Sequence, residues 1–128
     1  MSTVTRHLQA VVPPDNRLLV VLSWDQHDPF AVTMDVYVRL GLAPERWVFA
    51  LDLLEAGLHG LAGELDIFVL PASESQTRIV LRPPGRVLAT LLLPSTGVAA
   101  FLADTFIVDA LPIPDYLYDI NWGEVVEG

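Results

Sequence analysis

The stretch Phe30-Ala31-Val32-Thr33-Met34-Asp35-Val36-Tyr37-Val38 decides the fold class of this chain. Its even-numbered residues are all apolar, whereas its odd-numbered residues mix polar and apolar types. Because successive side chains of a strand point to opposite faces of a sheet, this alternation predicts a strand with one face in the core. Turn-forming residues lie on both sides of it, at 25–29 and 41–44.

The segments around this strand complete a first group of elements. Three more strands are predicted at 6–12, 16–23 and 44–50. Leu51 to Leu58 then combines good helix formers with an acid in the first turn, which predicts a short helix of about two turns. Gly57 is expected to take the left-handed conformation that ends many helices, with Leu58 folding back as its hydrophobic partner.

The C-terminal half follows the same order of elements. Strands are predicted at 63–70, 76–82 and 86–93, and a helix from about Ser95 to Phe106. This helix is expected to bury one side, made of Val98, Phe101, Leu102 and Thr105. The predicted fold is therefore α+β and mainly antiparallel, in the order ββββα-βββα. The repeated order hints at an internal duplication, in which each half is a small antiparallel meander closed by a helix.

An acidic tail is predicted at 111–128, after a single domain at 1–110. From Asp109 onward the chain has five acids, no base, two prolines and three aromatic residues, a composition typical of a tail with anchor points. Tyr116, Tyr118 and Trp122 are the candidate partner-binding residues, because buried aromatic side chains dominate binding hot spots. For Trp122 this role is weighed against packing onto the body of the same molecule, and that packing is preferred.

The composition indicates more apolar surface than one small domain hides. Hydrophobic residues make up 52% of the 128 residues, charged residues make up 18%, and the mean hydropathy is +0.47. We therefore expect a homo-oligomer, a trimer or a tetramer, formed through an edge strand or the outer face of the sheet. The chain has no cysteine, which excludes disulfides and thiolate metal sites.

The charge argues against nucleic acid and membranes as partners. The formal net charge is −9, and all seven basic residues are arginine, so long-range forces repel phosphate backbones and anionic lipids. Only a gathering on one face of the arginines at 17, 39, 46, 78, 82 and 86 would favour nucleic acid. No apolar run has the length of a membrane span, and the N-terminus lacks a secretory signal, so a cytoplasmic protein without membrane insertion is expected.

Catalytic, cofactor-binding and metal-binding residues are not assigned, because no motif for such a site occurs. Asp25, His27 and Asp28 lie together before Pro29, where a metal or proton-transfer role is weighed against an ordinary turn, and the turn is preferred. Likewise, His59 is expected in the turn after the first helix, and His7 has no recognisable companion. Trp24 and Trp47 are expected to be buried, Trp47 in the core or an interface.

Several stretches, in this order and spacing, resemble the SsgA-like sporulation and cell-division proteins of filamentous actinobacteria. They are Asp28 to Met34; Trp47 to Phe49 with Asp52 to Leu54 and Gly57-Leu58; Gly63 to Pro71; and Phe101-Leu102 with Thr105. The resemblance covers about residues 7–110. Departures from the family pattern are Leu51, where a basic residue is usual, and Ala103-Asp104, which replace an acid–base pair.

The resemblance implies a Whirly-like fold and a protein that needs no cofactor and is not an enzyme. It implies a regulator of septum formation in sporulation, located in the cytoplasm at the division septum. Its partner would be the tubulin-like division protein FtsZ or a sister SsgA-like protein. Because Whirly proteins bind single-stranded nucleic acid, a nucleic-acid-binding relative is the alternative, which the net charge disfavours. An unrecognised enzyme is a third hypothesis, which a deep pocket with convergent polar groups would favour.

Overall fold

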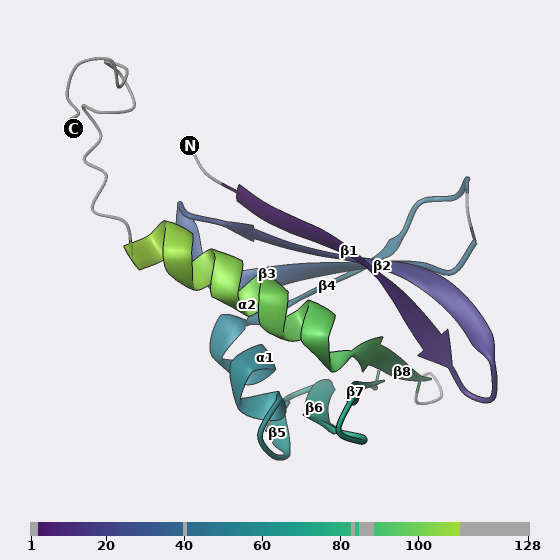
Figure 1. Ribbon diagram of the computed structural model, residues 1–128. Coiled ribbons are helices and arrows are strands. Elements are labelled where there is room, and N and C mark those ends of the chain that lie inside the picture. Colours follow the sequence, from purple (N-terminus) through teal and green to yellow (C-terminus); the bar gives the residue numbers. More distant parts are fainter. Residues whose placement is uncertain (1–2, 40, 83, 85–88, 111–128) are drawn as a thin grey trace.

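The computed structural model describes residues 3–39, 41–82, 84 and 89–110 (Figure 1). The N-terminal strands are β1 (Thr3–Val12), β2 (Asn16–Asp25), β3 (Asp28–Tyr37) and β4 (Glu45–Ala50). The C-terminal strands are β5 (Ala62–Glu64), β6 (Ile67–Pro71), β7 (Gln76–Leu81) and β8 (Ala89–Pro94). The helices are α1 (Leu51–Gly57), which links the two groups of strands, and α2 (Ser95–Ala110). None of the helices in these ranges is long and apolar enough to cross a membrane.

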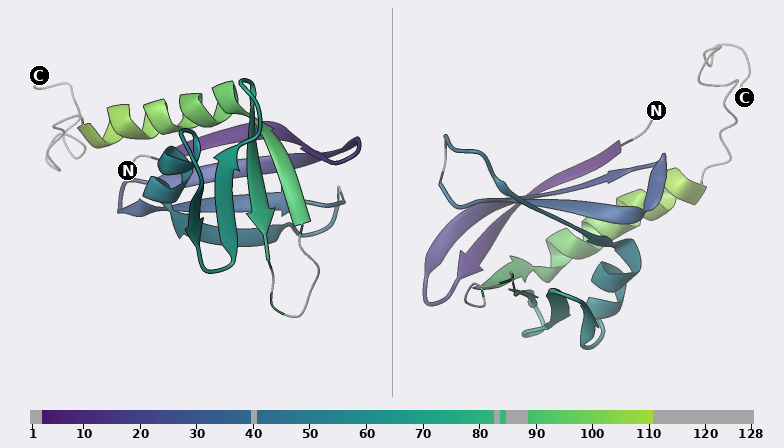
Figure 2. Two further views of the ribbon diagram at one scale, coloured as in Figure 1. Left: turned by 90° about the horizontal axis from the view of Figure 1, so that it is seen from below. Right: turned by 180° about the vertical axis from the view of Figure 1, so that it is seen from behind.

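One antiparallel sheet contains all eight strands, in the order β4-β3-β2-β1-β8-β7-β6-β5. It coils into a nearly closed barrel, with α1 and α2 packed on its inner side (Figure 2). The β1 strand pairs with β2 along its whole length but meets β8 only at Val11 and Leu92. The two groups of four strands therefore join at one narrow seam, and α2 lies against β1 beyond it.

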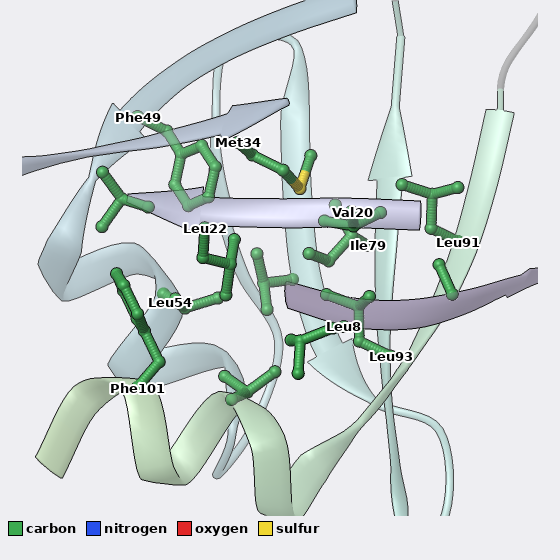
Figure 3. Close-up of a cluster of buried hydrophobic side chains, with 14 of the residues drawn as sticks. Leu8, Val20, Leu22, Met34, Phe49, Leu54, Ile79, Leu91, Leu93 and Phe101 are labelled. Atoms are coloured by element: carbon green, nitrogen blue, oxygen red, sulfur yellow. The ribbon is translucent and has the colours of Figure 1, made fainter. Parts of the chain in front are cut away.

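The core lies on the inner face of the sheet, beneath the two helices. Figure 3 shows Met34 and Leu22 of the sheet in one cluster with Leu54 of α1 and Phe101 of α2. Burial of these large side chains supplies most of the favourable free energy of folding. On α2, the predicted buried side is confirmed for Val98, Phe101 and Thr105, while Leu102 is half-buried.

The β3 strand confirms the alternation from which the fold was predicted, but only over its middle. Val32, Met34 and Val36 are buried on the inner face. Phe30 and Val38, which have the same parity, are 80% and 67% exposed. They lie at the two ends of the apolar stretch, where the alternation continues but burial does not.

The predicted strand at 63–70 is wrong in its continuity. It is two strands, β5 and β6, joined by a tight turn at Leu65-Asp66. Leu65 has φ 49° and is 90% exposed. A two-residue hairpin favours such left-handed residues, and these are usually glycine, asparagine or aspartate. Because leucine is not a typical turn residue, this hairpin had no signal in the sequence. The observed order of elements is ββββα-ββββα.

The prediction for Gly57 is also wrong. The helix α1 ends with Leu58 as a right-handed C-cap, at φ −72° and ψ −22°. In the described part of the chain the glycine with positive φ is Gly41. A Cβ atom at position 57 would instead overlap the Val69 side chain on β6. Gly57 is therefore required for close packing between α1 and β6, and not for a left-handed turn.

Candidate protein-binding surfaces

The candidate residues Tyr116, Tyr118 and Trp122 lie outside the described residues, as does the whole predicted tail. The structure follows the chain to Ala110 at the end of α2. The candidate binding surfaces that it describes are therefore those of the body, on the sheet and the two helices.

The cluster of Asp25, His27 and Asp28 forms the tight turn between β2 and β3. The His27 backbone N–H donates a hydrogen bond to Asp25 Oδ1 at 2.8 Å, which is a local turn interaction. The preferred turn interpretation is thus confirmed. Within the described ranges, no three His, Asp or Glu side chains are grouped so that they could hold a metal ion.

The remaining histidines and tryptophans occupy structural positions. His59 lies in the turn after α1, as predicted, and its N–H bonds to the Ala56 carbonyl at 3.0 Å. Trp24 is 2% exposed, and its indole N–H donates to the Pro29 carbonyl at 2.9 Å. Trp47 is half-buried and packs against the core. His7 is exposed on β1, opposite Val21.

Neither α1 nor α2 lies over the outer face of β1 to β4 in the described part of the chain (Figures 1 and 2). Cross-strand pairing places Thr5, Ser23, Thr33 and Val48 in one row and His7, Val21, Asp35 and Arg46 in the next. Many of these side chains are short, and most of them are exposed or half-buried. A sheet face of this kind is an available contact surface for another protein.

Asp35 and Arg46 form the main charged pair of this face. Arg46 donates two hydrogen bonds to the Asp35 carboxylate, Nε to Oδ1 at 2.8 Å and the terminal nitrogen to Oδ2 at 3.0 Å. The hydrogen bond and the charge of Asp35 raise the pKa of Arg46 above its ordinary value. The pair satisfies Asp35, which is only 8% exposed, and it neutralises Arg46 as a contact for an outside anion.

Two shallow grooves lie on this face. One, of about 340 Å³, is lined by residues that include Gln9, Arg17, Leu19 and Tyr37. The other, of about 470 Å³, is lined by residues that include Thr5, Ser23, Thr33 and Val48. Their linings are short hydroxyl, apolar and a few charged side chains, a mixture suited to contact with a protein segment.

The arginines of the described residues are divided between both sides of the sheet and several strands. Arg17 lies on β2 and Arg78 on β7, separated by β1 and β8. Arg82 stacks on the Phe68 ring, 5.6 Å from its centroid. Arg46 is paired with Asp35, and on the inner side Arg6 is paired with Asp104 at 3.2 Å. Arg39 follows β3, and position 86 is outside the described ranges.

We predict that the protein does not bind single-stranded nucleic acid at physiological salt. Tight binding needs several free cations along one phosphate path, whereas Arg6 and Arg46 are paired with acids and Arg17 is separated from Arg78 by β1 and β8. Fluorescence anisotropy with a labelled single-stranded oligonucleotide should show no saturable signal. Binding that weakens steeply as salt rises would contradict this expectation and favour the nucleic-acid alternative.

Two exposed phenylalanines mark a second surface that the sequence did not reveal. Phe30, at the start of β3, was expected on the buried face but is 80% exposed. Phe106, in the last turns of α2, is 72% exposed. Phe30 lies just after the β2–β3 turn and Phe106 in the last turns of α2. Figure 1 shows that this turn and the end of α2 lie at the same end of the molecule. Phe106 directly follows the buried Thr105 and so lies beside the buried side of α2. This position relative to Val98, Phe101 and Thr105 is the sequence signal that could have predicted its exposure.

Comparison with known proteins identifies the family. Residues 18–110 match the family model described as "Streptomyces sporulation and cell division protein, SsgA". The sporulation-specific cell division protein SsgB of Streptomyces coelicolor is 34% identical over 105 residues, which are 77% of this chain and 74% of that protein. A sporulation-specific cell division protein of Frankia casuarinae is 39% identical over 87 residues, 65% of this chain. That alignment spans 57% of the length of the Frankia protein.

Two solved structures have a similar fold. One was reported with the finding that mutations in SsgB correlate to longitudinal cell division during sporulation of Streptomyces coelicolor. It is 29% identical, with a TM-score of 0.73, over 84% of this chain and 89% of that one. The crystal structure of an SsgA-like sporulation-specific cell division protein from Thermobifida fusca is 27% identical, with a TM-score of 0.71, over 95% of this chain and 91% of that one. The chain therefore belongs to the SsgA-like family of sporulation and cell-division proteins.

Proposed function

We propose that this protein regulates septum formation by binding another protein, and that it does so without catalysis at the division septum, in the cytoplasm. Membership of the SsgA-like family is the observation that carries this proposal. The shallow grooves and the helix-free sheet face support it, because they suit contact with a protein better than enclosure of a substrate. A Whirly-like ancestry of the fold is part of the same proposal.

The partner that we propose is FtsZ or a sister SsgA-like protein. Purified FtsZ, assembled with GTP and sedimented, should carry the wild-type protein into the pellet. If it does not, the same assay with a purified sister protein, by co-elution, tests the second partner. Failure of both would remove the proposed partners while leaving the family assignment intact.

We propose that the tail is part of the recognition surface, with Tyr116, Tyr118 and Trp122 as anchors. Truncation after Leu111 is predicted to weaken partner binding, while the body stays folded because both helices and the whole sheet lie upstream. Because a short segment that orders on binding loses conformational entropy, affinity in the intact protein should be modest, on the order of micromolar. Circular dichroism checks the fold, and pelleting with FtsZ checks the binding.

Two results would contradict the tail proposal. Unfolding of the truncated protein would mean that the tail packs onto the body as part of the core. A folded, truncated protein with unchanged affinity would place recognition elsewhere on the body. The expected homo-oligomer, a trimer or a tetramer, stays a prediction, which sedimentation velocity of the intact protein tests directly.

A further inference from the structure

A small cavity lies between α1, α2 and the end of β2. Its volume is about 120 Å³, which is the space of about four water molecules and so enough for one apolar side chain. Its lining is mostly apolar and consists of Trp24, Leu51, Glu55, Leu102, Thr105 and Phe106. Trp24 and Thr105 are buried and satisfied by hydrogen bonds to carbonyl groups. Hydrogen bonds therefore hold the buried part of the lining in place, and the rest of the lining is mostly apolar.

Exposed aromatic surface continues beyond this cavity. Phe106 forms part of the lining and is 72% exposed. Phe30 lies at the same end, because Ala31 pairs with Ala50, which leads into Leu51 of the lining. The Trp24 indole also bonds to the Pro29 carbonyl, next to Phe30. An exposed phenylalanine in the lining of a cavity that fits one side chain, with a second exposed phenylalanine at the same end of the molecule, is an arrangement typical of a binding hot spot.

The charges around this surface are negative. Glu55 lines the cavity, and Asp52 lies one turn before it on α1, with both residues exposed. Neither helix contains a basic residue. The C-terminal end of α2 also carries the negative end of the helix dipole. Arg6, which reaches α2, is neutralised by Asp104. The surface is therefore complementary to a cation placed beside an apolar group.

We propose that this surface binds a segment of a partner protein in which an aliphatic or aromatic residue lies next to lysine or arginine. The apolar residue fills the cavity beside Phe106, and the basic residue approaches Glu55 and Asp52. This inference rests on the proposed protein-binding function but not on the identity of the partner. Charge decides among the occupants: the chain's own segment at 111–128 has acids and no base, and a second copy has a net charge of −9.

The test is selection of short random peptides, displayed on phage, against the full chain. The selected sequences should combine a bulky apolar residue with lysine or arginine. The best one, synthesised with a fluorophore, is then titrated by fluorescence polarisation. Phe106→Ser and Glu55→Lys should each weaken its binding by about tenfold or more, as expected for hot-spot residues.

Matched controls use exposed residues that do not line the cavity. Leu65→Ser removes an apolar side chain that is 90% exposed, and Glu74→Lys reverses an exposed charge in the β6–β7 turn. Both should leave peptide affinity within about twofold, since surface changes outside a hot spot have small effects. Thermal unfolding checks that each variant folds, and Glu55→Lys tests the proposal independently if Phe106→Ser does not.

Several outcomes would overturn the proposal. In the selection, these are acidic peptides, peptides that resemble residues 111–122, or no peptides at all. In the titration, it is an equal loss of binding in Phe106→Ser and Leu65→Ser. A wild-type oligomer that dissociates in Phe106→Ser would instead make the surface an interface between copies. If peptides bind as expected but FtsZ and sister proteins do not, only the named partners of the proposed function fail.

Discussion

Phe101→Ala is expected to lower the free energy of unfolding by about 3–5 kcal/mol, the range for a buried phenylalanine truncated to alanine. The Phe101 side chain is 0% exposed and lies in the cluster that joins α2 to α1 and the sheet (Figure 3). Its removal loses apolar burial and leaves a void that packed neighbours fill only in part. Domains of this size have a total stability of about 5–15 kcal/mol, so the variant should be close to unfolding.

Urea denaturation followed by tryptophan fluorescence measures this loss, with the free energy obtained by linear extrapolation. Phe106→Ala is the matched control, because it makes the same substitution five residues later on α2 at a side chain that is 72% exposed. Its effect should stay within about 0.5 kcal/mol, which is usual for surface positions. Similar losses in the two variants would mean that α2 packs on the sheet with a different face.

The positions of most strands along the chain were predictable because one buried face imposes a period of two on the sequence. Val32, Met34 and Val36 carry that signal, and each is buried as the pattern requires. The same argument located α2, where Val98, Phe101 and Thr105 repeat at helical spacing and lie inward. Where burial on one side decides the conformation, the residue pattern is enough.

The errors have the opposite cause: each depends on contacts or backbone angles that no local pattern carries. Leu65 takes a left-handed conformation that leucine seldom adopts, so the break between β5 and β6 had no signal. Phe30 belongs to a regular alternation but lies at the end of the stretch, where it is 80% exposed. How many residues of a strand are buried depends on the length of the elements that pack against it, which the local sequence does not give.

The candidate surfaces divide in the same way. Sequence composition pointed to the aromatic residues of the tail, which lie outside the described ranges. The helix-end cavity joins Trp24, Leu51 and Phe106, which are far apart in the sequence and meet only in the folded chain. What the sequence did provide was Leu51 as a departure from the family pattern, and this residue lines that cavity. The sequence thus drew attention to one residue of the cavity, whereas only the fold brings its lining residues together.

Gly57→Ala is expected to destabilise the protein by about 1–3 kcal/mol, the range for inserting an extra methyl group into a packed core. The sign is informative, because replacing glycine with alanine within a helix ordinarily stabilises by about 0.5–1 kcal/mol. Here the new Cβ would overlap the Val69 side chain and come within 3.0 Å of the Val69 carbonyl carbon. Since Val69 is 0% exposed, neither group has free space to move into.

Two further variants isolate this contact in chemical denaturation experiments. Gly60→Ala, three residues later, should be nearly neutral, because a Cβ there meets no atom within 4 Å. Val69→Ala removes the Cγ1 atom that a Cβ at position 57 would approach most closely, although it keeps the Val69 Cβ. The double variant should therefore lose less stability than the sum of the single losses. The coupling should be about 1 kcal/mol or more, as for residues in direct contact. A stabilised Gly57→Ala protein, or additive effects, would show that α1 does not approach β6 as closely as this packing requires, and that Gly57 serves the end of the helix after all.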